Sequence, residues 1–338
     1  MYKILLIFKY LRRKLAPLFA ALAVTLCTAM VIIVISVMGG FLDMLRSSAK
    51  KLTGDVVVSA RSLTGFAYYE QLIEELEAQP QIKAATPVIR TLGLMNLAGQ
   101  TMGVMIEGVR PQELDQIVSY RQTLHWSTAD LIEFQEDPSN RDPQHHEELE
   151  RIDLEAASLT LEPPAIWQRD SEGKQRRGAV IGIEVNPFPR RDEQGQYHFA
   201  YSAVGWELTL TVVPLSEGGA FRDLEPTYQR LIVVNEFKSG LYDVDAKVVF
   251  VPFELLQQML KMEPKKQWKK YDPLTLEPIG DPTIRSGRTS KVLVRGAAGY
   301  GVECLREVVQ LRVKEFADAH PAMVPPVVQT WEEVHGTL

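Results

Sequence analysis

The chain has 338 residues, of which 46% are hydrophobic and 24% are charged, and its formal net charge at pH 7 is -6. This composition excludes a disordered chain and a collagen-like fibre, and the length is sufficient for two ordinary domains. The acidic excess is local, because residues 119–178 hold 13 Asp and Glu against 7 Lys and Arg. A nucleic-acid surface would need clustered Lys and Arg, so we expect no nucleic-acid partner.

A long uncharged segment lies near the N-terminus. Leu15 to Leu42 comprises 28 residues without Asp, Glu, Lys, Arg or His. A helix rises about 1.5 Å per residue and a bilayer core is about 30 Å thick, so about 20 apolar residues span it. We therefore predict a transmembrane helix over residues 15–42. The alternatives are a buried core helix and a cleaved signal peptide, whose apolar region is only about 7 to 15 residues long.

Basic residues flank this segment unequally. Residues 1–14 mix five Lys and Arg with apolar side chains, which is typical of a short basic helix lying in the membrane interface. Arg46, Lys50 and Lys51 follow the span closely. The positive-inside rule therefore places the N-terminus in the cytoplasm and the bulk of the chain on the other side.

The exported part opens and closes with the same order of elements. Its hydrophobic patterns predict β-α-β-β at the start and β-α-β at the end. The predicted strands are 55–60, 82–90, 102–109, 290–295 and 326–331, and the predicted helices are 68–79 and 302–319. These pieces fit two βαβ halves that are separated in sequence but packed together, with helices on one face of a mixed sheet.

Two segments of different kinds lie between these halves. The acidic segment 119–178 is broken by prolines around one predicted helix, Gln144–Ala157, and we expect it to be a surface insertion. Residues 179–284 begin with four predicted strands and a helix, which indicates a small β-rich subdomain. These strands are 179–185, 206–213, 229–237 and 247–251, and the helix is 253–262.

Motifs for catalysis or metal binding are weak. The four potential ligands His145–Glu148 are adjacent, and adjacent helical residues point to different faces, so we expect a solvated helix and no metal site. Gly296–Gly301 has neither the dinucleotide nor the Walker spacing, and we expect a strand-to-helix turn. Cys27 and Cys304 are not expected to pair. With no G-x-S-x-G, HExxH or paired-cysteine signature, we expect no enzyme activity and no catalytic residues.

The loop from Pro214 to Arg230 is longer than a tight hairpin between two strands needs. Phe221, Leu224 and Pro226 are apolar residues within its otherwise polar composition. Two interpretations remain open. The loop folds onto its own subdomain, or it is an exposed hairpin that binds a partner.

Three segments together resemble a known family. The first is FKYLRRKLAPLFAALAVTLCTAMVIIVISVMGGF, a basic elbow and a first transmembrane helix, with Gly39 where Asn is usual. The second is LIVVNEFKSGLYDVDAKVVFVPFELLQQML around Gly240–Asp245, and the third is the C-terminal VVQTWEEVHGTL. The chain is similar to the permease subunits of the LolC/LolE lipoprotein-releasing ABC transporters, within the wider MacB-like permease group.

This resemblance implies an α+β fold. An N-terminal transmembrane helix would be followed by a MacB-like periplasmic core, made of a split ferredoxin-like porter part and an inserted β-rich, sabre-like part. The porter part corresponds to residues 43–118 and 285–338, and the sabre-like part to residues 179–284. The acidic insertion 119–178 lies outside the resemblance. The location implied is the inner membrane, with the main domain in the periplasm.

The resemblance also implies partners. Two permease subunits, identical or different, would bind two ABC ATPase subunits, so that ATP is used by a partner and this chain binds no cofactor. The loop 214–230, with Phe221, Leu224 and Pro226, occupies the position of the hairpin that recruits the periplasmic lipoprotein chaperone, although its sequence differs. Membrane lipid is a further partner. We expect Ile35, Met38 and Phe41, near the outer end of the first helix, to contact acyl chains, because long flexible and aromatic side chains suit such contacts.

The expected function is that of a permease component that couples a cytoplasmic ATPase to an extracytoplasmic domain, in lipoprotein release. The alternatives are a MacB-like mechanotransmitting permease, a single-span membrane-anchored adaptor, and a membrane-anchored hydrolase, the last resting on fold class only. Family members have three further transmembrane helices, so we expect a fragment or a split gene product rather than a one-span relative. The sequence names neither the cargo nor the ATPase.

Overall fold

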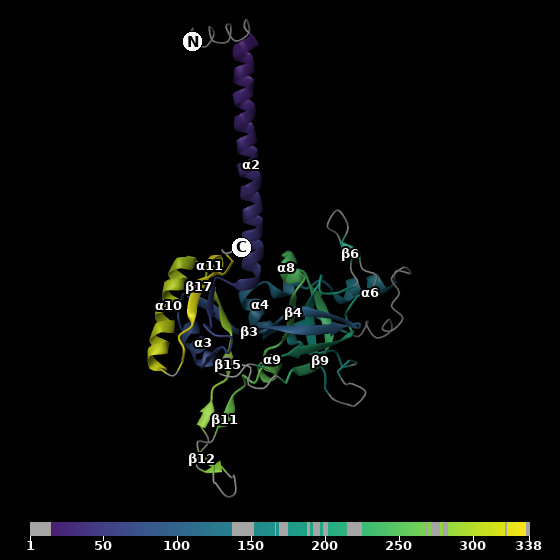
Figure 1. Cartoon of the computed structure of the whole chain (residues 1–338), viewed down its shortest axis with the longest axis vertical. Coiled ribbons are helices and arrows are strands. Elements are labelled where there is room, and N and C mark those ends of the chain that lie inside the picture. The colour runs from purple at the N-terminus through teal and green to yellow at the C-terminus, as the bar shows by residue number, and fades with distance from the viewer. Residues whose placement is uncertain are drawn as a thin grey trace. The chain divides into compact units, whose positions relative to one another are not determined.

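The structure is a computed structural model, and it divides the chain into two units, residues 1–48 and 49–338 (Figure 1). Each unit is described by itself. The residues that the structure describes are 15–136, 152–165, 167–168, 175–187, 190–191, 197–198, 202–214, 225–267, 270–271, 278–279, 283–321 and 323–335.

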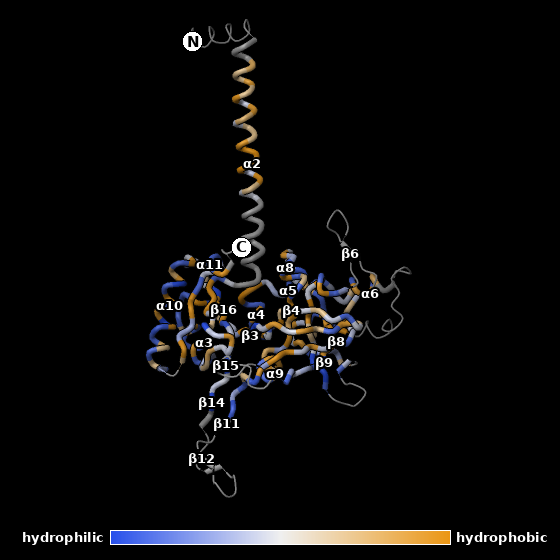
Figure 2. The backbone as a smooth tube through the Cα atoms, viewed as in Figure 1, coloured by the Kyte–Doolittle hydropathy of each residue, from blue (hydrophilic) through white to orange (hydrophobic). Residues whose placement is uncertain are grey.

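Helix α2 (Leu15–Thr53) carries the uncharged segment. Its stretch Phe19–Gly40 is 22 residues long and is the one part of the described chain that is long and apolar enough to cross a membrane. Figure 2 shows hydrophobic residues along this stretch, and their side chains are exposed. Thr25 and Thr28 donate their hydroxyl hydrogens to carbonyls one turn back, so these polar groups are satisfied within the helix. The helix continues beyond the predicted end at residue 42.

Four antiparallel strands form a sheet in the order β17-β1-β16-β3. Helix α3 follows the first strand in sequence and α10 follows the third. This strand order and these two helices are those of a ferredoxin-like fold, interrupted in sequence after its second strand. The predicted fold class is confirmed. The bounds are β1 Val56–Ser59, α3 Tyr69–Glu77, β3 Ile82–Leu97, β16 Lys291–Gly296, α10 Val302–Ala319 and β17 Val327–Thr330.

Helices α3 and α10 share a hydrophobic core with the sheet, and Figure 1 shows α10 alongside β17. On α10 the buried side chains of Leu305, Val309 and Val313 recur every four positions, which keeps them on one stripe of the helix. Leu72 and Leu76 of α3 are likewise fully buried in this core. The helical period of the sequence therefore sets which face of each helix packs on the strands.

The opposite face of the sheet packs against α4 (Pro111–Ile117). Leu114 and Ile117 of this helix form a second core with Val57 of β1 and Leu293 of β16. Because both faces of the ferredoxin-like sheet are covered, its strands read as continuous apolar runs rather than as strict alternation.

Six strands close into a barrel in the order β3-β4-β10-β5-β9-β8, and β8 pairs back onto β3. Alternate side chains of each strand point into the barrel and are fully buried, among them Met95, Ile106, Ile181, Leu210 and Val233. The further strands are β4 Gln100–Val109, β5 Arg177–Gly182, β8 Glu207–Val212, β9 Thr227–Phe237 and β10 Val248–Pro252.

Strand β3 belongs to both sheets. It pairs with β16 as far as Val88, and with β8 from Leu94 onwards. We predicted a strand that ends at Arg90, whereas β3 continues to Leu97. Gly93 accounts for the difference, because its lack of a side chain permits a close approach of β8. A Cβ at Gly93 would lie 2.7 Å from the carbonyl oxygen of Thr211.

The described parts of the acidic segment pack on the barrel. Trp126, Leu131 and Leu154 are buried in a cluster with Ile232 of β9. The helices here are α5 Tyr120–Thr123, α6 Thr128–Glu136 and α7 Leu154–Thr160.

The predicted helix Gln144–Ala157 is confirmed only in part where it is described, because residues 154–157 are helical. Ile152 and Asp153 are not helical, and α7 begins at Leu154. The side chain of Asp153 accepts a hydrogen bond from the backbone N–H of Ala156, which caps the helix at this point.

The remaining elements are short. Helix α9 contacts β4, and β11 pairs with β14 in a narrow arm that extends away from the barrel in Figure 1. The backbone N–H of Thr330 donates to Glu333, and the N–H of Glu333 donates to the Thr330 hydroxyl, so a capping box starts α11. The bounds are β2 Phe66–Ala67, β6 Arg190–Arg191, β7 Tyr197–His198, α8 Tyr242–Asp245, α9 Phe253–Met259, β11 Lys265–Gln267, β12 Lys270–Tyr271, β13 Pro278–Ile279, β14 Thr283–Arg285, β15 Arg288–Thr289 and α11 Trp331–His335.

Candidate functional site

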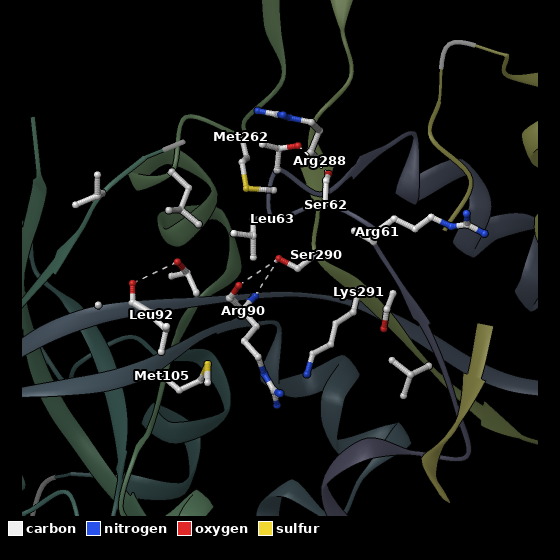
Figure 3. Close-up of a pocket in the computed structure, with 18 of the residues that line it drawn as sticks. Arg61, Ser62, Leu63, Arg90, Leu92, Met105, Met262, Arg288, Ser290 and Lys291 are labelled. Carbon is white, nitrogen blue, oxygen red and sulfur yellow. Dashed lines mark hydrogen bonds between the residues drawn. The ribbon is translucent and has the colours of Figure 1, made fainter. Parts of the chain in front are cut away.

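A cavity of about 880 Å³ lies where the ferredoxin-like sheet meets the barrel (Figure 3). Its floor is the outward face of β3, with the side chains of Arg90, Leu92 and Leu94. The loop after β1 contributes Leu63, and Met262 lies beyond α9. This volume is in the range of pockets that hold small ligands, and most of its lining surface is apolar.

The cavity exists because one edge of β3 lacks a strand partner over a short distance. Pairing with β16 stops at Val88, and pairing with β8 starts at Leu94. Between them, the hydroxyl of Ser290 accepts a hydrogen bond from the Arg90 N–H at 3.1 Å, as Figure 3 shows. In a strand, alternate residues direct their peptide groups to the same edge, so the peptide group of Leu92 also faces this gap.

Four cationic side chains line the cavity, Arg61, Arg90, Arg288 and Lys291, and none of its described lining residues is Asp or Glu. Acidic residues outnumber basic ones in the chain as a whole, 43 to 37. The cavity therefore departs from the average charge of the protein. In Figure 3, Arg288 lies at one edge beside Met262, and Arg61 extends outwards at another edge.

Two of these cations are held by a buried carboxylate. Glu107 of β4 accepts a hydrogen bond from Arg90 Nε at 2.5 Å, and Lys291 Nζ lies 3.4 Å from its Oε1. Burial opposes the charged form of Glu107, but the two cations outweigh it and lower its pKa to about 2. Burial, together with nearby Arg90, lowers the pKa of Lys291 to about 8 against the attraction of Glu107. Arg90 and Lys291 thus share one compensating anion, Glu107.

The other two cations differ from this pair. Within the part of the chain that the structure describes, the guanidinium groups of Arg61 and Arg288 form no hydrogen bond or ion pair. Partial burial and the charge of nearby Arg285 lower the pKa of Arg288, while Glu263 acts in the opposite direction. The cavity edge at Arg288 is consequently electropositive.

The three residues predicted to contact acyl chains lie on α2, outside the cavity. Ile35 and Met38 are three positions apart, so they share a face of the helix, and both side chains are exposed. Phe41 continues the helical backbone, and its side chain lies outside the description. Their contact with acyl chains stays a prediction.

The predicted partner hairpin is described only at its base. Phe221 and Leu224 lie outside the described residues. Pro226 is exposed and lines the cavity, as does Val213 at the other end of the loop. The base of this loop and the cavity are therefore neighbouring features of one surface.

Of the two weak motifs in the sequence, the one that lies within the described residues has a structural role. Gly296–Gly301 joins the end of β16 to the start of α10, as predicted, and Gly299 has a φ of +96°, which favours glycine. His145–Glu148 lies outside the described residues. Among the described residues no cluster of His, Cys, Asp and Glu is arranged to hold a metal ion.

The segment around Gly240 forms a turn held by Asp245. One carboxylate oxygen accepts from the backbone N–H and the hydroxyl of Ser239 at 2.7 and 2.6 Å, and the other accepts from the Gly240 N–H at 3.1 Å. Gly240 has a φ of +86°. This network presents the exposed ring of Tyr242 on a turn of fixed shape.

A second buried carboxyl group lies at Glu236 of β9. It accepts hydrogen bonds from the indole N–H of Trp126 at 2.5 Å and from the side-chain amide of Asn186. Burial nevertheless raises its pKa to about 7. Sequence reasoning missed both Glu107 and Glu236. The signal that was available is an acidic residue in the middle of an apolar strand.

The N-terminal part of the chain matches a known family. Residues 18–141 match the family model of the MacB-like periplasmic core domain. This part of the chain is therefore similar to a MacB-like periplasmic core domain. The match begins in α2, includes β1, β3 and β4, and extends into the acidic segment that we expected to lie outside the resemblance.

Two solved structures are similar over most of the chain. The periplasmic region of MacB from Actinobacillus actinomycetemcomitans is 9% identical, with a TM-score of 0.39, and the alignment covers 85% of this chain and 94% of that one. The extracellular domain of the noncanonic ABC-type transporter YknZ from Gram-positive bacteria is 12% identical, with a TM-score of 0.38 and coverages of 82% and 98%. Such identities and TM-scores assign no function. No match was found among curated proteins.

The match to this domain family, together with the apolar helix that precedes the sheet, agrees with the expected fold. The match does not distinguish the lipoprotein-releasing subtype.

Proposed function

We propose that the chain is a permease component of an ABC-type transporter, which couples a cytoplasmic ATPase to the unit formed by residues 49–338. The observation that carries this proposal is the match of residues 18–141, because it begins in the apolar helix and continues into the sheet. The excess of basic residues before the span favours a cytoplasmic N-terminus, and hence a periplasmic main unit at the inner membrane.

We propose the following assignment of residue ranges to the parts of the protein. Residues 1–14 form an interfacial basic helix and residues 15–42 the membrane span. Residues 43–118 and 285–338 form the porter-like part, and residues 179–284 the β-rich sabre-like part. A second permease subunit completes the membrane complex, while the described parts of the acidic segment 119–178 pack against the barrel.

Lipoprotein release is the finer form of this proposal. Ile35 and Met38 present long apolar side chains from one exposed face of α2, which suits contact with an acyl chain. Phe41 would extend that face. The loop with Phe221, Leu224 and Pro226 would contact a periplasmic lipoprotein chaperone.

A photo-crosslinking amino acid at position 38 tests the acyl contact in the intact membrane complex. Release of lipoproteins predicts crosslinks to a lipoprotein that disappear after ATP hydrolysis. The matched control is position 36, which lies on nearly the opposite side of the helix at about 100° per residue. Equal capture of lipid alone at both positions would exclude this role for Met38.

A mechanotransmitting permease is the second candidate, and strand β3 favours it. The same strand pairs with β16 of the ferredoxin-like sheet and with β8 of the barrel. A displacement of one sheet along β3 is therefore carried into the other. This candidate predicts ATP-dependent changes in the 49–338 unit without any substrate crosslink from α2.

Reading the genomic DNA beyond codon 338 tests the permease proposal against a single-span adaptor. Three further apolar segments, in frame or in the adjoining gene, support a permease. A stop codon with no membrane-protein gene beside it supports an adaptor and contradicts the proposal.

A further inference from the structure

The cavity at the junction of the sheet and the barrel has the features of a binding site that the transporter proposal does not use. It is bounded on its floor by Leu92 and Leu94, and at its sides by Leu63, Met105 and Met262. Leu92 and Leu63 are largely exposed, at 74% and 84%. Such large apolar side chains are exposed around the cavity. An apolar group that covers them removes this surface from water, which lowers the free energy.

The charge of the cavity restricts what can cover it. Arg90 and Lys291 share the single anion Glu107, whereas the guanidinium of Arg288 has no hydrogen bond or ion pair within the described residues. No described carboxylate lines the cavity. The guanidinium of Arg288 would therefore attract an anionic group and repel a cationic group.

We propose that this cavity binds the apolar chain of an anionic amphiphile, with the anionic group beside Arg288. The chain lies along the outward face of β3, on Leu92 and Leu94, and Arg61 adds positive charge at the outer edge. The hydroxyl groups of Ser62 and Thr91 supply the few polar contacts. A fatty acid is the simplest ligand of this class. The inference does not depend on the transporter proposal, since a membrane-anchored adaptor would present the same cavity.

The test uses the full chain in nanodiscs of phosphatidylcholine. The probe is a palmitate analogue with a photoreactive diazirine in its chain, and the matched probe is a quaternary ammonium with the same chain. Both probes enter the bilayer and label α2, which gives an internal reference for their concentration. The proposal predicts that the palmitate probe also labels residues 57–64 and 90–94, and that the ammonium probe labels only α2.

Two pairs of variants locate the site. Leu92→Trp fills the cavity from an exposed position and should lower labelling there about tenfold relative to α2, while Leu311→Trp on the exposed side of α10 should leave it unchanged. Arg288→Glu should lower labelling by the anionic probe about fivefold, while Lys314→Glu should not change it.

Three results would overturn the proposal. Equal labelling of the cavity by both probes would remove the role of Arg288. Unchanged labelling in Leu92→Trp would place the bound chain elsewhere. Binding of a soluble peptide of alternating Leu and Glu, without labelling by the palmitate probe, would make the cavity a peptide site.

Discussion

Glu107 and Lys291 form an ion pair across strand β3. Lys291 lies on β16 and Glu107 on β4, with β3 between them, and the Nζ–Oε1 distance is 3.4 Å. Both side chains are nearly buried, with exposed fractions of 12% and 11%. The pair therefore ties the ferredoxin-like sheet to the barrel at the strand that the two share.

Replacing Glu107 by Gln should destabilise the fold by about 3 kcal/mol, because Lys291 and Arg90 would lose their shared anion. Urea unfolding of the full chain in nanodiscs measures this loss. The control is Glu254→Gln, which removes an exposed partner of Arg110 and should cost less than about 1 kcal/mol. Equal losses in the two variants would show that the buried pair has no special role.

The same carboxylate makes stability depend on pH at the acid end. The folded pKa of Glu107 is about 2, against an ordinary value of 4.5. A depressed folded pKa contributes stability above pH 4.5, and this contribution is lost as the pH falls from about 4.5 towards 2. Glu107→Gln should therefore lose stability less steeply than the parent chain over this window.

Glu236 should act in the opposite sense. Its folded pKa is raised to about 7, so between pH 4.5 and 7 the folded chain keeps a proton that the unfolded chain has released. Stability should fall by about 3 kcal/mol as the pH rises through this window, and then level off. The difference in unfolding free energy between Glu236→Gln and the parent chain should therefore vary with pH over this window. A difference that is the same at every pH would rule out this titration.

Gly93 is needed for closure of the barrel. In Gly93→Ala the new methyl group would lie 2.5 Å from the Cδ1 of Ile106 and 2.7 Å from the Thr211 oxygen. We expect a loss of about 2 kcal/mol, because neither neighbour can move freely. Gly103→Ala is the matched control, since a Cβ there meets nothing within 4 Å. Thermal unfolding of both variants compares them, and equal midpoints would contradict the close approach of β8.

The β3–β4 turn offers a stabilising change. Ala98 and Gly99 have φ values of +51° and +79°, as a two-residue hairpin of this hand requires. Ala98→Gly should stabilise the chain by about 1 kcal/mol by relieving the left-handed conformation. Gln310→Gly, at an exposed position in the middle of α10, should instead lose up to about 1 kcal/mol. The same sign in both variants would contradict this account of the turn.

The sequence was informative where periodicity and local chemistry decide the structure. The helix over 302–319 follows from its apolar spacing, and it is confirmed. The barrel was missed because its closure depends on pairing of β3 with β8, more than a hundred residues away in sequence. Gly93 and Asn96 also interrupt the strand pattern of β3, so its second half gave no strand signal.

The cavity could not be predicted from any motif. It results from a short unpaired edge between Val88 and Leu94, and such a gap depends on where two distant strands end. Its cations come from the loop after β1, from β3, and from β15 and β16, and none has a diagnostic neighbour in sequence. Glu107 was detectable in principle, as a charge within the apolar run of β4.

The central claim is that this chain works with an ABC ATPase, and its purification from native membranes tests that claim most directly. The measurement is the composition and the ATP hydrolysis of the complex that purifies with the full chain in mild detergent, with and without vanadate. The account predicts an ABC ATPase subunit in equimolar amount and hydrolysis that vanadate inhibits. A chain that purifies without any nucleotide-binding subunit would contradict it.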